Sequence, residues 1–435
     1  MKLVKLGVLV AGAAIVAAAC SSGSSTPAPS SGGGGESPAA SAGGGGGAEK
    51  GTVKVGISLP LSGSSLASAG PARDGALLAI EEINAAGGVN GWKIDPVVLD
   101  HSVNGVHDPQ QGAKDVSSLV SDAAVVAVVG PFNSSVAKVQ IPISNEAGLL
   151  QCSPANTNES LTKPEFGALE IRKAFPDRIN YVRVATTDDV QGPAVAQFGV
   201  QSLGLKKVFI IDDTETYGKG LADNFAKEWE SLGGTVVGRE GAPKGTTDYV
   251  PILTKAKSLS PDSFFYGGVT ATGGGLVRKQ MPQAGLGDIP YMGGDGIQDG
   301  NGSVDGSFIN IAGPAAKDSY SSVAAIAEIP DAAAFADKYK AKYGVAPGSY
   351  SANGYACAQI VIDAIKTASA AGDPSREAVR AAGVDTATTF QTVLGPVQWD
   401  KNGDTSQKII SLYKVDMAGD NGKGDWVFEK QVDYK

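Results

Sequence analysis

The chain has 435 residues, 36 of them basic and 45 acidic, and a formal net charge of −9 at pH 7. This acidic balance argues against nucleic acid or an anionic lipid surface as the main partner, because both would repel it. One hydrophobic core seldom serves a chain of this length, so we expect two lobes.

The first residues are typical of a targeting segment. Lys2 and Lys5 precede an apolar run at 6–19 that is short for a membrane span, and three alanines lead to Cys20. This ending resembles a bacterial lipobox, in which a peptidase cuts before the cysteine and the cysteine then carries lipid. We therefore expect a lipoprotein signal peptide at 1–19 and a lipid anchor on Cys20. An ordinary signal peptide with a chance cysteine is the alternative.

Residues 20–49 are expected to combine the lipidated cysteine with a flexible linker. Positions 21–49 hold two glycine runs and almost no apolar side chains, so burial cannot offset the entropy of ordering them. No later stretch of the sequence is long and apolar enough to cross a membrane. The rest of the chain is therefore expected to be extracytoplasmic, in a periplasm or on the outer face of the cell membrane.

Beyond the linker, apolar segments of strand type alternate with segments of helical periodicity. Strands are predicted at 53–60, 92–99, 123–129, 149–152, 181–185, 206–212, 235–239, 262–266 and 289–292. Helices are predicted at 70–86, 108–121, 191–203, 219–232, 249–259 and 274–283, and one more follows Asn133. Helices at 331–343 and 350–369 and strands at 395–399, 408–415 and 426–428 complete the prediction. This alternation is typical of parallel sheets with helices on both faces, and it restarts at Tyr181, so the sequence predicts two α/β lobes.

Few side chains suit metal or redox chemistry. Cys152 and Cys357 are far apart in the sequence and are interpreted as buried free thiols, with pairing as the alternative. His101 and His107 are the two histidines, which are too few for a histidine-based metal site. We therefore expect no metal and no cofactor.

Enzymatic motifs are missing as well. There is no G-x-x-x-x-G-K-[ST] phosphate loop and no G-x-S-x-G nucleophile elbow. Ser135 and Lys138 match S-x-x-K, but this pattern fixes only two positions and the motifs that accompany it in known enzymes are absent. We therefore expect no catalytic residues and no enzymatic activity.

A more informative pattern follows the strand at 123–129, where GPFNSS leads into a predicted helix. Ligands of open parallel α/β lobes bind beyond the carboxyl ends of strands, and hydroxyls and amides at that place suit a carboxylate. CSPANT, which ends at Thr157, repeats the arrangement after the next strand. Helix capping by Asn133 or Ser134 is the simpler alternative. Pro142 predicts a kink or a short helix.

Together with motifs elsewhere, this pattern resembles the leucine/isoleucine/valine-binding proteins, the amino-acid receptors of bacterial ABC importers. The resemblance runs from about Thr52 to Trp399. It is carried, in the family's order, by VKVGISLPLSG, GALLAIEEINAAGGVNG, VVGPFNSS, CSPANT with LT, DDVQGP, DDTETYGKGLA, FFYGG, YMGGDG and GPVQWDKNGD. It implies the type I periplasmic-binding-protein fold, in which a three-crossing hinge joins two Rossmann-like lobes. In this chain the N-terminal lobe would comprise 50–185 plus 315–395, and the C-terminal lobe 186–314 plus 396–435.

The resemblance also implies which residues bind the ligand. Its carboxylate would meet three residues of the N-terminal lobe: Ser134, Ala155 and Thr157. The other lobe would bring a tyrosine over the ligand and an acid against its ammonium: Tyr217 and Asp295. The aromatic residue near the side-chain pocket would be Tyr350.

Four positions depart from the family pattern. Ala69 and Val269 stand where the family often has aromatic residues, which implies a larger or reshaped side-chain pocket. Asp295 is one methylene shorter than the usual glutamate. Asn133 takes the place of one cysteine of the family disulfide. The ligand is therefore expected to be a branched-chain or related amino acid, with an amide, urea or another small polar metabolite as alternatives.

The function implied by the resemblance is that of a monomeric solute-binding protein of an ABC importer. The ligand would bind between the lobes, the hinge would close over it, and the closed form would deliver it to a membrane permease. A ligand sensor of the same fold, which signals to a membrane partner, is the second hypothesis. An enzyme is the third and least favoured.

Overall fold

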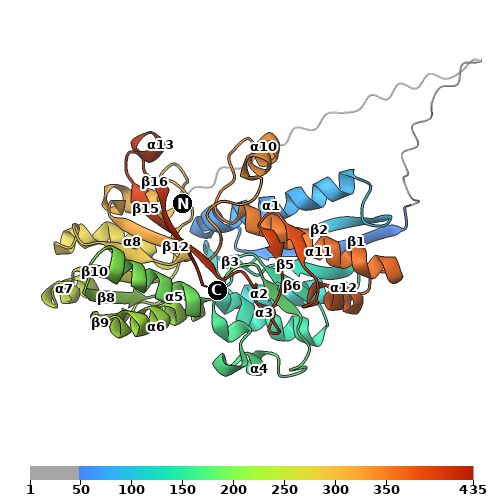
Figure 1. The fold of residues 1–435 in the computed structure, drawn as a ribbon, viewed down its shortest axis with the longest axis horizontal. Coiled ribbons are helices and arrows are strands. Elements are labelled where there is room, and N and C mark those ends of the chain that lie inside the picture. Colours follow the sequence, from blue (N-terminus) through green and yellow to red (C-terminus); the bar gives the residue numbers. More distant parts are fainter. Residues whose placement is uncertain (1–48, 435) are drawn as a thin grey trace, which may run out of the picture. The chain divides into compact units, whose positions relative to one another are not determined.

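Two separate sheets organise the part of the chain that the computed structural model describes, residues 49–434. The predicted signal peptide, Cys20 and the linker up to residue 48 lie outside the described residues. Each sheet carries helices on both faces, as the sequence predicted (Figure 1). The α/β class and the two-lobe organisation are therefore confirmed.

The first sheet has five parallel strands in the order β2-β1-β5-β6-β7. Their bounds are β1 Gly51–Leu59, β2 Trp92–Asp100, β5 Val125–Val129, β6 Leu150–Ser153 and β7 Tyr181–Arg183. The helices of this lobe are α1 Leu66–Ala85, α2 Pro109–Ser121, α3 Ser134–Glu146, α4 Ala168–Ile171, α10 Ala332–Tyr343, α11 Ser351–Ala371 and α12 Arg376–Gly383. Two short antiparallel pairs belong to it as well: β3 Ser102–Val103 with β4 Val106–His107, and β13 Phe390–Thr392 with β14 Gly395–Val397.

Strand β5 shows why these residues form the centre of a sheet. All five of its residues are buried, because helices cover the sheet on both faces. Ala127 and Val129 pack in the apolar cluster that contains α1 and α11. Val128 points the other way and packs with Leu119 of α2. The continuous apolar run in the sequence therefore reflects burial on two sides.

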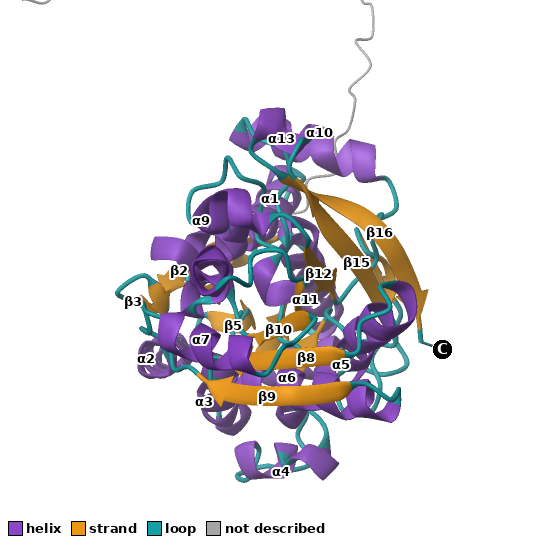
Figure 2. Ribbon diagram, turned by 90° about the vertical axis from the view of Figure 1, so that its left-hand side faces the viewer, coloured by secondary structure: helices purple, strands orange, loops and turns teal. Residues whose placement is uncertain are grey.

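The second sheet has seven strands in the order β16-β15-β12-β11-β10-β8-β9. Their bounds are β8 Lys207–Asp212, β9 Thr235–Gly241, β10 Ser263–Gly267, β11 Tyr291–Gly293, β12 Ser319–Val323, β15 Ile409–Asp416 and β16 Asp425–Asp433. Its helices are α5 Asp188–Gln197, α6 Thr216–Ser231, α7 Val250–Ser258, α8 Gly274–Gln280 and α9 Phe308–Ala312, and a short turn, α13 Gly419–Gly422, joins the last two strands. Figure 2 shows β15 and β16 as a long antiparallel pair at one edge of this sheet.

The lobe boundaries differ from those expected. Strand β12 pairs with β11 and β15, so the second lobe extends to Val323 and not to residue 314. Trp399 packs in the core of the first lobe. The chain therefore crosses between the lobes for the last time at residues 400–408, and not between residues 395 and 396 as expected. The sequence of β12, SYSSV, is rich in serine, and its residues Ser319, Ser321 and Ser322 are buried. A polar composition of this kind gives little strand signal.

Cys152 and Cys357 form a disulfide, so the expectation of buried free thiols is wrong. Their Cα atoms lie 5.5 Å apart although 205 positions separate them in the sequence. The reason is that α11, which carries Cys357, packs against the strand that carries Cys152. Sequence separation alone does not reveal that proximity.

Pro142 neither ends nor shortens its helix. Helix α3 continues for four residues beyond Pro142, to Glu146. The carbonyl group that loses its helical partner belongs to Lys138, and this residue is exposed to solvent. The expected short helix is therefore not observed.

The described residues contain no helix with both the length and the apolar character that a bilayer span requires.

Candidate ligand-binding site

The first side of the site is the loop between β5 and α3. The strand ends at Val129, and Ser134 opens the helix with only 2% of its surface exposed. Asn133 occupies the N-cap position, but its side chain makes no capping hydrogen bond, so the capping alternative is wrong for this residue. The first amides of a helix have no acceptor within the helix, and the helix dipole favours negative charge there. Ser134 therefore lies where a carboxylate would be stabilised.

The loop after β6 lies against this helix start. Ser153 donates a hydrogen bond to the carbonyl of Pro131 at 2.7 Å and accepts one from the amide of Asn156 at 2.9 Å. Ala155 and Thr157 are thereby held beside the GPFNSS loop, and both are buried. The hydroxyl of Thr157 has no hydrogen-bond partner. The structure thus brings together all three residues that the sequence assigned to the carboxylate.

The second lobe contributes a tyrosine and a carboxylate that contact one another. Tyr217 lies in the first turn of α6, and Asp295 follows β11. The hydroxyl of Tyr217 donates to Oδ1 of Asp295 at 2.7 Å and accepts from the amide of Gly296 at 3.1 Å. Burial raises the pKa of the Asp295 carboxyl, although hydrogen bonds from the two tyrosines act in the opposite direction. Asp295 is only 4% exposed, so a cation would stabilise its charged form.

Tyr350 connects this acid to the first lobe. It precedes α11, and its hydroxyl donates to Oδ2 of Asp295 at 2.5 Å. Its ring meets Phe132 of the GPFNSS loop edge-on, with 4.9 Å between centroids. The backbone at Tyr350 has a φ of +63°, in the left-handed region that a residue with a side chain seldom adopts. Tyr350 therefore joins the two sides of the site.

Ala69 and Val269 are placed less centrally. Ala69 is fully buried in the apolar cluster of the first lobe, which also includes Phe132 and is packed by Tyr350. Val269 is half-buried, and a Cβ on Gly296 would lie 2.9 Å from its Cγ1. Val269 therefore borders the Asp295 segment.

Two further polar residues, which the sequence analysis did not select, lie at the same place. The amide of Asp188 donates to the carbonyl of Thr157 at 2.8 Å, and Oδ1 of its fully buried side chain has no partner. Burial, reinforced by Glu159 and Asp295, raises the pKa of Asp188 well above its ordinary value. Gln191 is fully buried one turn later, and both polar atoms of its side chain are unpartnered. Both residues lie in the motif DDVQGP, which could have indicated them from the sequence.

The lobes touch around these residues. Nδ2 of Asn158 donates to the carbonyl of Thr216 at 3.0 Å, and Nδ2 of Asn224 donates to Oε1 of Glu159 at 3.0 Å. On the other flank, Ser349 donates to Oε1 of Gln298 at 2.5 Å. Unpartnered buried polar atoms are uncommon in folded proteins, so their concentration between two touching lobes marks a place that suits a polar ligand.

A family model described as periplasmic binding protein matches residues 52–423. The chain belongs to this family. Its relatives include the Leu/Ile/Val-binding protein homolog 1 of Brucella suis biovar 1, 30% identical over 378 residues that cover 86% of this chain and 93% of the relative. The resemblance and the fold expected from the sequence are thereby confirmed.

Two solved structures resemble this periplasmic binding protein closely. A leucine-binding protein from Thermotoga maritima has a TM-score of 0.73 at 27% identity, covering 87% of this chain and 98% of that one. A branched-chain amino acid transporter substrate-binding protein from Streptococcus pneumoniae, in complex with isoleucine, has a TM-score of 0.71 at 28% identity. It covers 87% of this chain and 100% of that one.

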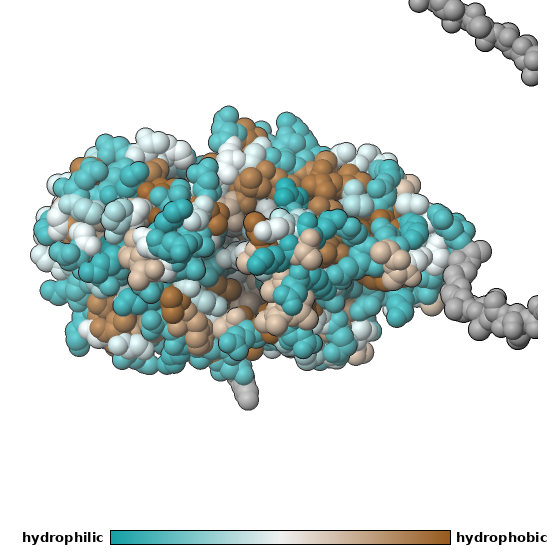
Figure 3. All heavy atoms as spheres, turned by 90° about the horizontal axis from the view of Figure 1, so that it is seen from above, coloured by the Kyte–Doolittle hydropathy of each residue, from teal (hydrophilic) through white to brown (hydrophobic). Residues whose placement is uncertain are grey.

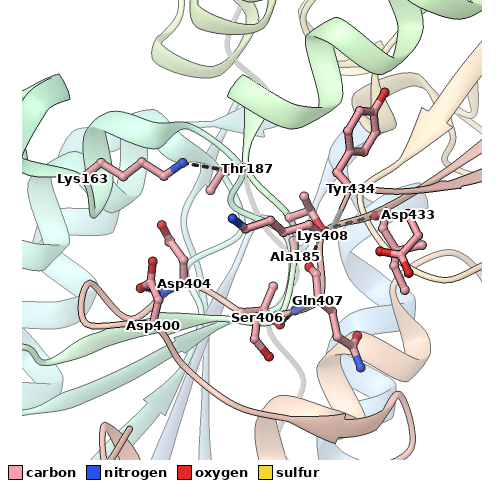
Figure 4. A pocket seen from close by; sticks show the side chains of 13 residues that line it. Lys163, Ala185, Thr187, Asp400, Asp404, Ser406, Gln407, Lys408, Asp433 and Tyr434 are labelled. Atoms are coloured by element: carbon pink, nitrogen blue, oxygen red, sulfur yellow. Dashed lines mark hydrogen bonds between the residues drawn. The ribbon is translucent and has the colours of Figure 1, made fainter.

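The hinge side of this periplasmic binding protein holds a cavity of about 570 Å³ (Figure 4). It is lined by Lys163, Thr187, Asp404 and Lys408 among others, and none of the predicted ligand-binding residues is among them. Asp404, which lines this cavity, forms a buried ion pair with Arg183, with 2.7 Å between Nε and Oδ1. Arg183 also donates to the carbonyl of Asn158 at 2.7 Å. This pair ties the loop that follows Thr157 to the last crossing between the lobes.

A second cavity, of about 690 Å³, lies behind Tyr350. Its lining is largely apolar and includes Ile329, Phe335, Leu394 and Trp426. Seen from above, the surface of the molecule has apolar and hydrophilic side chains interspersed (Figure 3). Tyr350 is the one predicted ligand-binding residue that also lines this cavity.

Neither histidine has the surroundings of a metal ligand. Among the described residues, no group of three or more His, Cys, Asp or Glu side chains is arranged to hold a metal ion. Nδ1 of His101 lies 3.1 Å from the hydroxyl of Ser58, and burial lowers the pKa of His101 to about 3.

Proposed function

We propose that this protein binds an α-amino acid, of the branched-chain or a related kind, between its lobes and delivers it to the permease of an ABC importer. The observation that carries the proposal is that groups suited to a carboxylate and a group suited to an ammonium lie on opposite sides of the lobe interface. The start of α3 and the Thr157 hydroxyl suit a carboxylate, and the Asp295 carboxylate suits an ammonium. An amino acid presents these two groups on one carbon atom.

The relatives support the amino-acid class. The name of the Brucella protein refers to leucine, isoleucine and valine, that of the Thermotoga protein refers to leucine, and the Streptococcus protein is in complex with isoleucine. The small side chains at Ala69 and Val269 favour a side chain at least as large as those of leucine and isoleucine. A binding protein of this kind needs no catalytic group, and none is proposed.

Binding is proposed to proceed in two steps. The ligand first docks on the N-terminal lobe, with its carboxylate at Ser134, Ala155 and Thr157. The hinge then closes and brings Tyr217 and Asp295 over it. Closure excludes water, which strengthens the charged contacts.

The protein is proposed to act as a monomer outside the cytoplasmic membrane, with lipid on Cys20 as its anchor. The disulfide supports this location, because disulfides persist in oxidising compartments. Mass spectrometry of the mature protein tests the anchor, and an unmodified Cys20 would contradict it.

The function itself is tested by thermal melting of the mature protein with a panel of amino acids, amides, urea and sugars. Ligand that binds only the folded state raises the midpoint as its concentration increases. A shift with α-amino acids supports the proposal and identifies the preferred side chain. A shift with amides or urea alone would contradict the roles of Ser134 and Asp295. Transport of the identified ligand, lost when the gene is deleted, distinguishes import from sensing.

A further inference from the structure

A turn between β6 and β7 of the first lobe reaches helix α6 of the second lobe. Its residues Asn158 and Glu159 are buried. Nδ2 of Asn158 donates to the carbonyl of Thr216 at 3.0 Å, and Oε1 of Glu159 accepts from Nδ2 of Asn224 at 3.0 Å. Thr216 directly precedes Tyr217, so the turn meets α6 where the helix carries its residue of the proposed binding site. We call this contact between Asn158, Glu159 and α6 the Asn158 latch.

Asn158 is held firmly from its own lobe. Its Oδ1 accepts a hydrogen bond from the amide of Ser160 at 3.1 Å. Its carbonyl accepts one from the fully buried guanidinium of Arg183 at 2.7 Å, and Arg183 is in turn paired with Asp404. The side-chain amide is therefore engaged at both ends, with Oδ1 bonded within the first lobe and Nδ2 bonded across the interface. A displacement of this side chain would break hydrogen bonds on both sides.

Helix α6 has no side chain opposite Asn158. Gly220 lies one helical turn after Thr216, and a Cβ on Gly220 would overlap Nδ2 of Asn158. Among the described residues outside α6, Asn158 is the one that this Cβ would meet within 4 Å. The φ of Gly220 is not in the left-handed region, so its backbone does not require glycine. Because glycine inside a helix is destabilising relative to alanine, its presence here needs another reason, and the close approach of Asn158 supplies one.

We propose that Asn158 and Gly220 are positioning residues, which set how tightly the closed form is held, and thereby the affinity for the ligand, without contacting the ligand. This inference rests on the proposed function, because it takes ligand binding to be what brings the lobes together. Opening of the lobes breaks the hydrogen bond from Asn158 to Thr216. The Asn158 latch therefore slows ligand release, and it has little effect on docking, which takes place on the open N-terminal lobe.

The test is calorimetry and stopped-flow dissociation of L-isoleucine from the mature protein. Asn158→Ser keeps a hydroxyl that can cap the turn but cannot reach Thr216, so the Kd is expected to rise roughly 3- to 10-fold, chiefly through faster dissociation. Gly220→Ala is expected to weaken binding at least as much, because the added methyl displaces Asn158 from its hydrogen bonds. Lys227→Ala, at an exposed position of the same helix, is the control that is expected to keep the wild-type Kd. Wild-type affinity in Asn158→Ser and Gly220→Ala would overturn the proposal.

The double variant of Asn158→Ser and Gly220→Ala separates the Asn158 latch from general damage to the protein. Serine lacks the atoms that the added methyl would meet, so the double variant is expected to bind about as tightly as Asn158→Ser alone. Losses that multiply would show that the two residues act independently, which overturns the proposal. Without ligand, Gly220→Ala is expected to melt no lower than the wild type, because alanine stabilises a helix relative to glycine. A lower midpoint would attribute the weaker binding to a damaged lobe and would also overturn the proposal.

The same measurements separate this proposal from the proposed function. If L-isoleucine binds and all variants match the wild type, the proposed function stands and the role of the Asn158 latch is wrong. If only an amide or urea raises the melting midpoint, the amino-acid assignment fails. Calorimetry with that compound is then expected to show the same losses and the same rescue, because neither Asn158 nor Gly220 is among the proposed ligand-binding residues. Equal affinities of all variants for that compound would overturn the proposal.

Discussion

Tyr350 of the first lobe donates a hydrogen bond to Oδ2 of Asp295 in the second lobe, at 2.5 Å. Tyr217 donates to the other oxygen of the same carboxylate at 2.7 Å. One buried acid is therefore held in a fixed orientation by tyrosines from both lobes. The contact across the lobes fixes this orientation in the closed form, which makes Asp295 the most informative residue to change.

Replacing Asp295 by Asn is expected to weaken the binding of an α-amino acid strongly. The substitution leaves the ammonium of the ligand buried without a counter-charge, and such losses amount to about 2–5 kcal/mol. Calorimetry should therefore show a fall in affinity of roughly 30- to several thousand-fold. Asp305→Asn, at an exposed position of the same lobe, serves as the control. Unchanged affinity in Asp295→Asn would exclude the ammonium contact.

Tyr350→Phe is expected to speed ligand release. It removes the hydroxyl that reaches Asp295 across the lobes but keeps the ring that packs on Phe132. A hydrogen bond to a charged group is worth about 1.5–3 kcal/mol, so dissociation measured by stopped flow should accelerate roughly 10- to 100-fold. Tyr413→Phe, on β15 of the second lobe, is the matched control. Equal dissociation rates in all three proteins would show that the contact does not restrain the closed form.

Thr157→Val tests the carboxylate side of the site. Valine has the shape of threonine but lacks the hydroxyl, which is buried without a partner in this structure. We expect weaker binding of isoleucine, by about 1 kcal/mol or more, and no comparable loss for isoleucinamide, which has no carboxylate. Calorimetry with both compounds measures the difference. Equal losses for the two would assign Thr157 to another part of the ligand.

The disulfide is expected to contribute to stability without taking part in binding. Replacing Cys152 and Cys357 together by serine should lower the free energy of unfolding by about 2–5 kcal/mol. Urea denaturation of the variant and of the wild type, with and without dithiothreitol, measures this. The reductant should destabilise only the wild type, and a reductant effect on the variant would point to another cause.

Stability is also expected to fall in acid because of His101. Its pKa is about 3 in the folded protein, below the ordinary value of a histidine, so the unfolded chain binds the proton more readily. The contribution is complete above the ordinary pKa and is lost progressively as the pH falls from about 6.5 towards 3. Denaturation between pH 4 and pH 7 should show a shallower dependence in His101→Gln. An identical slope in both proteins would show that other groups dominate.

Much of the fold and of the candidate site of this protein could be predicted from its sequence. The central strand Val125–Val129 is recognisable in the sequence because helices cover both of its faces, so all five of its residues are apolar. The hydroxyl-rich segments after two neighbouring strands predicted a ligand site, since the carboxyl ends of parallel strands meet at one edge. The resemblance to a known family then assigned the residues Ser134, Thr157, Tyr217 and Asp295, and the structure brings them together.

Only the tertiary structure decided the rest, because the missing information lies in contacts between distant segments. The serine-rich strand Ser319–Val323 is a strand because β11 and β15 offer it partners. Cys152 and Cys357 pair because α11 crosses the first sheet above β6. Asp188 is a buried acid, and His107 faces Glu215, only because the two lobes meet there. A sequence shows the chemistry of each residue and its local periodicity, whereas charge burial and pairing across 100 or more positions depend on how the folded segments pack.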